Sequence, residues 1–183
     1  MFTLLTRTTA AAAILASALA TPAAAQDWKS ELPVFRVGLL GGENEADRLR
    51  KNECMVEQLG EKLGVPVELY PASDYAGVMQ GLLAGQLDAA SLGASGYAGI
   101  YLQDPEAVEP IFVALENDGS DGYYAMMYTK SDSGIESIDD MKGKSLAFAD
   151  PNSTSGYLVP KAELEAQEIN IEEYFSSTGF GGG

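Results

Sequence analysis

Short strand-like apolar runs alternate with helix-like runs along most of this chain, and this order restricts the fold to the α/β class. Strand-like and helix-like segments follow one another at 33–40, 43–63, 65–71, 73–85, 87–92 and 93–101. Strands that are separated by helical crossovers pair in parallel, so the pattern predicts a mainly parallel sheet with helices packed on it. Gly64 follows the first helix-like run as a terminating glycine, and Asp74 can cap the second.

The pattern restarts in the second half of the chain. Two more strands are predicted at 110–116 and 123–130, on either side of a polar turn. After a polar breaker, the predicted elements are one helical turn at 137–141, a strand at 145–149, a helix at 157–167 and a further unit that begins at 169–174. We expect a nearly complete first α/β lobe at 26–130 and the start of a second lobe at 131–183, within a C-terminally truncated chain. The alternative is a complete protein with a disordered glycine-rich tail.

The first 25 residues have the layout of a secretory signal peptide. Arg7 precedes an alanine-rich apolar run at 10–20, and the small residues at 21–25 predict cleavage after Ala25. The apolar run is short for a membrane-spanning helix, which argues against an anchor. The only cysteine, Cys54, leaves no internal disulfide, and an exported chain of this kind suits a bacterial periplasm.

Composition excludes several classes of function. The chain has no histidine, which excludes Ser-His-Asp and Cys-His catalysis within it and removes the usual zinc ligands. The formal net charge of −16 argues against nucleic acid or acidic lipid as a partner. The acidic residues lack metal-loop spacing, so no metal or cofactor is expected. No nucleophile–base pair is visible either, and we expect a binding protein rather than an enzyme. Cys54 falls on a helical pattern and is predicted to be a small core residue.

Residues 150–156 (DPNSTSG) carry the most informative chemistry. They follow a predicted strand and precede a predicted helix, which places Ser153, Thr154 and Ser155 at a helix N-terminus. Unpaired backbone N–H groups, the positive end of the helix dipole and nearby hydroxyls can together hold a tetrahedral oxyanion. The alternative is an ordinary Ser/Thr helix cap.

Tyr75 also follows a predicted strand and opens a helix. Ligands of open α/β sheets bind at the carboxyl edge, so its phenol can point into a cleft there, although an ordinary partly buried tyrosine is the alternative. The segment 91–95 follows the next strand and occupies an equivalent position. Tyr123, at the start of a predicted strand, is expected in the core or in the cleft wall.

Together these segments resemble the periplasmic solute-binding proteins of ABC importers, in particular the branch that binds phosphonate, phosphite or phosphate. The matching stretches are 74–82 (DYAGVMQGL), 87–90 (LDAA), 118–123 (DGSDGY), 138–144 (IDDMKGK) and 150–160 (DPNSTSGYLVP). The last stretch is the specific one, whereas elements like 138–144 occur in many solute-binding proteins. The resemblance implies a periplasmic-binding-protein-like (type II) fold, in which two α/β lobes close on the ligand.

The resemblance also implies a site and a role. Ser153, Thr154 and Ser155 would hold the phosphonate oxygens, and Tyr75 would face the ligand from the other lobe. The protein would capture a small anionic ligand in the periplasm and deliver it to an ABC permease in the inner membrane, with no cofactor. Two alternatives remain: a phosphate- or phosphite-specific protein of the same fold, or a sensory ligand-binding module of a receptor.

The chain departs from the family pattern at two points. A second aromatic residue commonly follows the third strand of the family, whereas Ser91 or Leu92 stands there in this chain. The family's next second-lobe element would begin at 181–183, where this sequence stops. The first departure bears on which oxyanion is bound, and the second implies that this chain holds part of the site.

Overall fold

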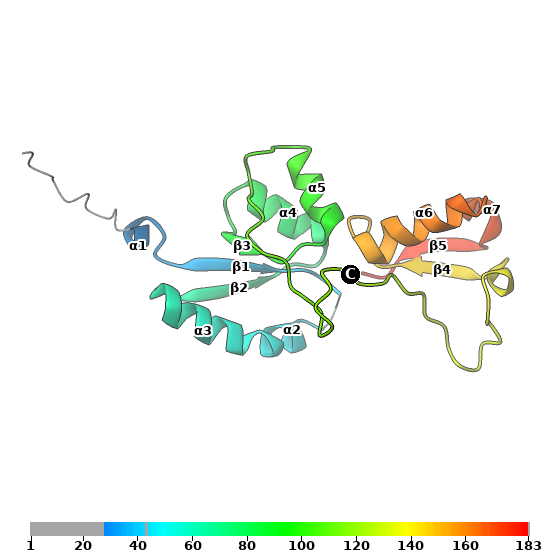
Figure 1. Ribbon diagram of the computed structural model, residues 1–183, viewed down its shortest axis with the longest axis horizontal. Coiled ribbons are helices and arrows are strands. Elements are labelled where there is room, and N and C mark those ends of the chain that lie inside the picture. The colour runs from blue at the N-terminus through cyan, green and yellow to red at the C-terminus, as the bar shows by residue number, and fades with distance from the viewer. Residues whose placement is uncertain (1–27, 43, 183) are drawn as a thin grey trace, which may run out of the picture.

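The computed structural model describes residues 28–42 and 44–182, which form two separate parallel sheets (Figure 1). The strands are β1 (Phe35–Leu39), β2 (Val67–Pro71), β3 (Ala89–Ala90), β4 (Ser145–Phe148) and β5 (Ser177–Phe180). The first sheet has the order β2-β1-β3 and the second pairs β4 with β5. The α/β class and the parallel pairing are therefore confirmed, while the predicted signal peptide lies outside the described residues.

The helices lie between the strands in chain order. The α-helices are α1 (Trp28–Glu31), α2 (Glu45–Lys51), α3 (Glu53–Leu63), α4 (Tyr75–Leu83), α5 (Ala94–Tyr101), α6 (Val159–Ala166) and α7 (Ile171–Tyr174). A 3₁₀ turn, η1 (Asp139–Met141), precedes β4, and a π-helical turn, η2 (Thr154–Leu158), leads into α6. We refer to residues 28–101 as the first unit and to residues 139–182 as the second unit. None of the helices in the described part of the chain is long and apolar enough to cross a membrane.

Helices α3 and α4 pack on opposite faces of the first sheet. Gly38 of β1 faces α4, since a Cβ atom there would lie 3.1 Å from Cγ1 of Val78. Gly60 of α3 instead faces Val67, which is paired with Phe35 and therefore points to the other face from Gly38. In Figure 1 the two helices accordingly lie on opposite sides of the strands.

The core of the first unit lies between α4 and α5. Val78, Met79 and Leu82 of α4 pack with Ile100 of α5, and Val78 and Ile100 are fully buried. Each such side chain contributes about 1.5–3 kcal/mol of hydrophobic stabilisation. This packing fixes the two helices side by side, with both N-termini directed toward the second unit (Figure 1).

The helix ends predicted at Asp74 and Gly64 are confirmed, but one predicted helix is divided in two. Asp74 caps α4 through its Oδ1, which accepts from the Gly77 N–H at 2.8 Å, and Gly64 ends α3 with a φ of 69°. The single helix predicted at 43–63 is instead divided at Asn52. The Nδ2 of Asn52 donates to the Arg48 carbonyl at 2.8 Å, and such side-chain bonds to the preceding turn compete with the regular helix.

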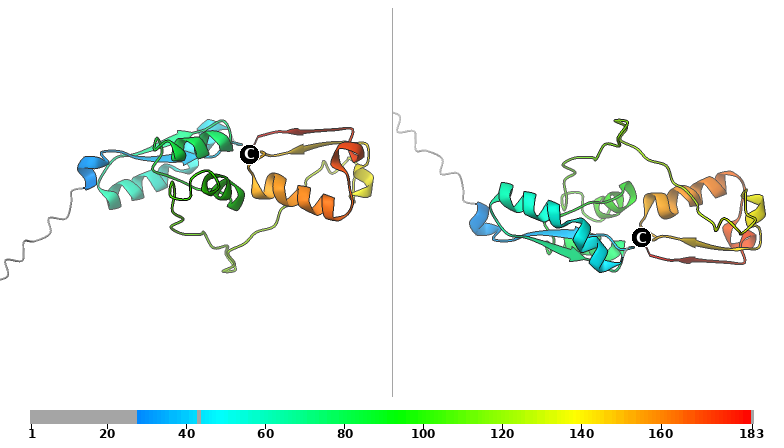
Figure 2. Two further views of the ribbon diagram at one scale, coloured as in Figure 1. Left: turned by 90° about the horizontal axis from the view of Figure 1, so that it is seen from above. Right: turned by 90° about the horizontal axis from the view of Figure 1, so that it is seen from below.

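The two strands predicted at 110–116 and 123–130 do not form. The described structure has no partner strand beside either segment, and an extended segment without a ladder partner is not a strand. Their large apolar side chains are exposed; these are Ile111, Phe112, Val113, Leu115, Tyr123, Tyr124, Met126, Met127 and Tyr128. Tyr123, which is 63% exposed, therefore lies outside the core. Figure 2 shows this connection running outside both units.

One further expectation was wrong, and one alternative does not hold. Cys54 is exposed rather than in the core, because it lies on the outer face of α3, and its Sγ is 3.3 Å from Nε2 of Gln58. The glycine-rich end of the chain is not a disordered tail within the described residues. It forms β5, which pairs from Ser177 opposite Ser145 to Phe180 opposite Phe148. The ring of Tyr157 packs edge to face against both Phe148 and Phe180, one from each strand.

The exposed segment 110–128 predicts that the chain binds hydrophobic dyes in its folded state, since exposed apolar patches of this extent are unusual. Phe112 and Tyr124 are 84% and 89% exposed, and replacing both by Ser should lower the fluorescence of bound ANS. Leu102→Ser, at an equally exposed position outside the segment, serves as the control. If Leu102→Ser lowers the fluorescence as much as the double variant does, segment 110–128 is not the dye-binding surface.

The turn before β4 predicts a specific pH dependence. The Asp140 carboxylate accepts from the Ser137 hydroxyl and from the Glu136 and Ser137 amides, and these bonds hold its pKa below the ordinary value. The folded state therefore favours the ionised form, and this stabilisation, present above the ordinary pKa, is lost as pH falls through the lowered one. In an NMR titration Ser137→Ala should raise the pKa of Asp140 and leave that of Asp118, which Ser120 lowers, unchanged. An Asp140 pKa that Ser137→Ala leaves in place would refute this account.

Candidate functional site

The loop at 150–155 lies where the two units meet, against the N-termini of α4 and α5 (Figure 1). The Tyr75 N–H, at the start of α4, donates to Oδ2 of Asp150 at 3.2 Å. The Ser95 N–H, in the first turn of α5, donates to Oγ1 of Thr154 at 2.9 Å. The predicted segments 74–82 and 150–160 are thus brought together, and the segment 91–95 joins them.

Ser153 is buried and caps its own helix. Its Oγ accepts from the Gly156 N–H at 3.1 Å, as a helix cap requires. This bond uses the hydroxyl only as an acceptor, so the hydroxyl hydrogen remains available to an anion. The cap alternative therefore describes the geometry correctly without excluding the anion site.

Thr154 is engaged with the first unit instead. Its Oγ1 accepts from the Ser95 N–H and lies 2.8 Å from the Ser95 Oγ. Ser155 lies in the same first turn and is partly buried. Tyr75, on the opposite side of the contact, is also partly buried, and the bond that ties it to the loop comes from its backbone. Of the predicted site residues, Thr154 and Tyr75 are joined to partners across the two units.

Close packing fixes the position of the loop. The Ala149 N–H, at the end of β4, donates to the Gly156 carbonyl at 3.0 Å. A Cβ atom on Gly156 would collide with Cβ of Ala149 and lie 2.9 Å from Oγ of Ser153, so only glycine fits there. The Leu158 N–H donates to the Ser153 carbonyl at 3.1 Å, which gives the first turn its wider π-helical form.

The electrostatics of the site are local. Three helices begin at this contact, and their first turns carry N–H groups that no helical carbonyl satisfies. The buried carboxylate of Asp150 accepts from one such donor, the Tyr75 N–H, and through Oδ1 at 2.7 Å from the N–H of Asn152 in its own loop. In the described residues no group of three or more His, Cys, Asp or Glu side chains is arranged to hold a metal ion. The chemistry available is hydrogen bonding to an anion.

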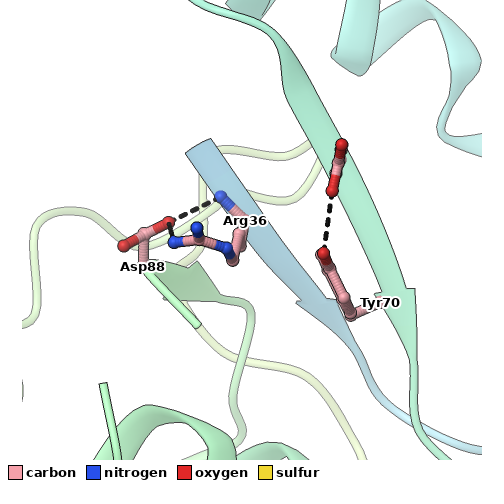
Figure 3. Close-up of polar contacts among 4 residues, drawn as sticks. Arg36, Tyr70 and Asp88 are labelled. Carbon is pink, nitrogen blue, oxygen red and sulfur yellow. Dashed lines mark hydrogen bonds and ion pairs between the residues drawn. The ribbon is translucent and has the colours of Figure 1, made fainter. Parts of the chain in front are cut away.

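Two polar contacts that the sequence analysis missed lie along the first sheet (Figure 3). Oδ2 of Asp88 accepts from the Arg36 N–H at 2.7 Å and lies 3.5 Å from the Arg36 guanidinium. The Tyr70 hydroxyl donates to Glu68 at 2.7 Å, and this bond raises the pKa of Tyr70. Because β3 has only two residues, the Asp88 contacts secure its start against β1. Arg36 and Asp88 lie at the amino ends of β1 and β3, away from the loop, whereas Tyr70 lies opposite Gly38 on β2.

The chain matches a family model. Over residues 37–183 it matches the model of the ABC transporter phosphonate periplasmic substrate-binding protein. It is 33% identical to the phosphonates-binding periplasmic protein of Escherichia coli over 79% of this chain and 42% of that protein. It is 33% identical to the phosphate-import protein PhnD of Mycolicibacterium smegmatis over 67% of this chain and 38% of that protein.

Solved structures agree with this fold. A binding protein component of an ABC phosphonate transporter from Pseudomonas aeruginosa is 28% identical, with a TM-score of 0.72 over 81% of this chain and 50% of that one. PhnD1 from Prochlorococcus marinus, solved with methylphosphonate, shares the fold at 22% identity, with a TM-score of 0.63 over 82% of this chain and 56% of that one.

The chain spans about two-fifths of the length of the two curated relatives and about half that of the two solved structures. Proteins of this family bind their substrates and are not enzymes, in line with the expectation from the sequence. The family match covers the first unit from residue 37 onward and the whole second unit, and with them the loop at 150–155 and the helix N-termini that it contacts. The chain belongs to the family of periplasmic substrate-binding proteins of phosphonate ABC transporters.

Proposed function

We propose that this chain forms part of a periplasmic protein that captures a phosphonate, or a related small oxyanion, between two lobes and delivers it to an ABC permease in the inner membrane. The observation that carries the proposal is the meeting of the loop at 150–155 with the N-termini of α4 and α5. Export by a signal peptide cleaved after Ala25 would place the protein in that compartment.

The oxyanion would be held mainly by neutral donors. In this proposal Ser153 and Ser155 donate their hydroxyl hydrogens, Thr154 supplies its backbone N–H, and Tyr75 approaches from the first unit. A hydrogen bond to a charged group contributes about 1.5–3 kcal/mol, so three or four such bonds reach the roughly 8 kcal/mol of a micromolar complex. The protein needs no cationic side chain at the site, which agrees with its acidic composition.

Closure of the two lobes would complete the mechanism. A ligand that contacts both units binds the closed arrangement more tightly than the open one and therefore shifts the population toward it. Only the closed form then presents one continuous surface to a permease. No covalent step is involved.

The second candidate is a phosphate- or phosphite-specific protein of the same fold. It is favoured by the name of the Mycolicibacterium smegmatis relative, which is a phosphate-import protein, and by the absence of an aromatic residue at 91–92. Calorimetry on the whole protein with methylphosphonate, 2-aminoethylphosphonate, phosphate and phosphite separates the two. Tighter binding of either phosphonate supports the first candidate, and tighter binding of phosphate or phosphite supports the second.

Removing single hydroxyls tests the site. Ser153→Ala and Ser155→Ala in the whole protein should each weaken binding of the best ligand by about 10- to 100-fold, the loss of one hydrogen bond to a charged group. Ser153→Ala should also lower the free energy of unfolding by about 1 kcal/mol, because it removes a cap. Ser177→Ala, on the exposed edge of β5, is the matched control. Calorimetric affinities that stay at the wild-type value in both site variants would reduce the motif to a helix cap.

Salt provides an independent test of neutral donors. Affinity for the ligand should change by less than about threefold between roughly 0.05 and 0.5 M sodium chloride, because no charged side chain pairs with the anion. The measurement is the dissociation constant at several salt concentrations. A steep loss of affinity with added salt would instead indicate a cationic site.

A further inference from the structure

The hydrogen bonds between the two units are concentrated on one residue. Four side-chain hydrogen bonds join residues 74–101 to residues 150–158 in the described structure, and three of them involve Ser95. Its partners, Asn152 and Thr154, are 57 and 59 positions away in the sequence. Ser95 therefore links two distant parts of the chain.

The hydrogens in this cluster can be assigned from the number of donors. The Ser95 hydroxyl donates its single hydrogen to the Asn152 carbonyl at 2.6 Å. The 2.8 Å contact between the two hydroxyls must then use the hydrogen of Thr154, donated to Oγ of Ser95. The Ser95 N–H donates back to Oγ1 of Thr154. In this arrangement the Thr154 hydroxyl has no hydrogen left for a ligand.

The same contact replaces a missing helix cap. The N-cap residue of α5 is Gly93, which has no side chain to accept a bond from the first turn. Thr154 accepts from Ser95, at the second position of α5, where a cap side chain normally bonds. A Cβ atom on Gly93 would lie only 3.0 Å from Oγ1 of Thr154, so the glycine leaves room for the residue that acts as the cap.

We propose that Ser95 and Thr154 form a latch between the two units that does not require a ligand, with Thr154 capping α5 from the second unit. Ser95 is a positioning residue: it holds the loop at 150–155 so that Ser153 and Ser155 face the oxyanion. The Tyr75–Asp150 bond belongs to the same latch, because separation of the units would break it together with the Ser95 bonds. Only the effect on affinity rests on the proposed function.

Amide hydrogen exchange of the ligand-free chain tests the latch. Thr154→Val keeps the shape of the side chain and removes the hydroxyl, so the amides of Ser95 and Tyr75 should both exchange at least about tenfold faster. The core amides of Leu82 and Ile100 should not change, which shows that the first unit stays folded. Thr178→Val, on the exposed strand β5, is the matched control and should leave all four amides unchanged.

A second variant covers the case in which Thr154→Val disturbs the second unit. Ser95→Ala retains the backbone N–H but removes the hydroxyl bonds to Asn152 and Thr154, and it should speed exchange at Tyr75, whereas Ser95→Thr should restore slow exchange. If the amides of Tyr75 and of residue 95 exchange at the wild-type rate in both Thr154→Val and Ser95→Ala, the latch is refuted.

Affinity separates this inference from the proposed function. In the whole protein, Ser95→Ala should weaken binding of methylphosphonate about 3- to 30-fold without changing its salt dependence, because the residue acts on the population of closed molecules. If exchange responds as expected but the wild-type protein binds no oxyanion, the latch stands and the proposed function fails. If the oxyanion binds and exchange does not respond, the function stands and the latch fails.

Discussion

Parallel pairing of β1 with β2 and β3 is the constraint on which the site depends. Parallel strands end at one edge, so the helices that follow β2 and β3 both begin there. Packing of Val78 against Ile100 then fixes α4 and α5 side by side with their N-termini together. In the second unit, β4 pairs in parallel with β5, and the loop at 150–155 follows the carboxyl end of β4. The units meet where helices of both begin, and an acidic chain can hold an anion there through local dipoles.

Much of the fold could be predicted because its signals are local. Asp74 and Gly64 mark helix ends through their own backbone and side-chain chemistry, and the alternation of strands and helices is visible within a short window. The segments whose secondary structure was not predicted correctly are those whose structure depends on strand partners elsewhere in the chain. The segments at 110–116 and 123–130 have the composition of strands but no ladder partner in the described structure. The segment at 177–180 becomes a strand only because β4 lies beside it.

The same distinction applies to the site. The order of strand, hydroxyl-rich loop and helix predicted that Ser153, Thr154 and Ser155 lie at a helix N-terminus, and the segments at 74–82 and 91–95 were expected at the carboxyl edge of the sheet; the structure brings these segments together. The sequence did not show which of these residues bonds within its own helix and which bonds to the other unit. Nothing in the local sequence says that Thr154 bonds to Ser95, or that Gly93 leaves space for it, because these contacts join residues about sixty positions apart. They depend on how the two sheets face one another.

The buried carboxylate of Asp150 has a further consequence for selectivity. An unoccupied amide at the start of α4 would attract chloride, sulfate or any other abundant inorganic anion. Asp150 already accepts from the Tyr75 N–H, so this donor is not open to small anions of the medium. In the proposed function the ligand would therefore depend on the remaining donors, those of Ser153, Thr154 and Ser155, which can hold several oxygens at once. Asp150 thereby takes the place that a single inorganic anion would otherwise occupy at the start of α4.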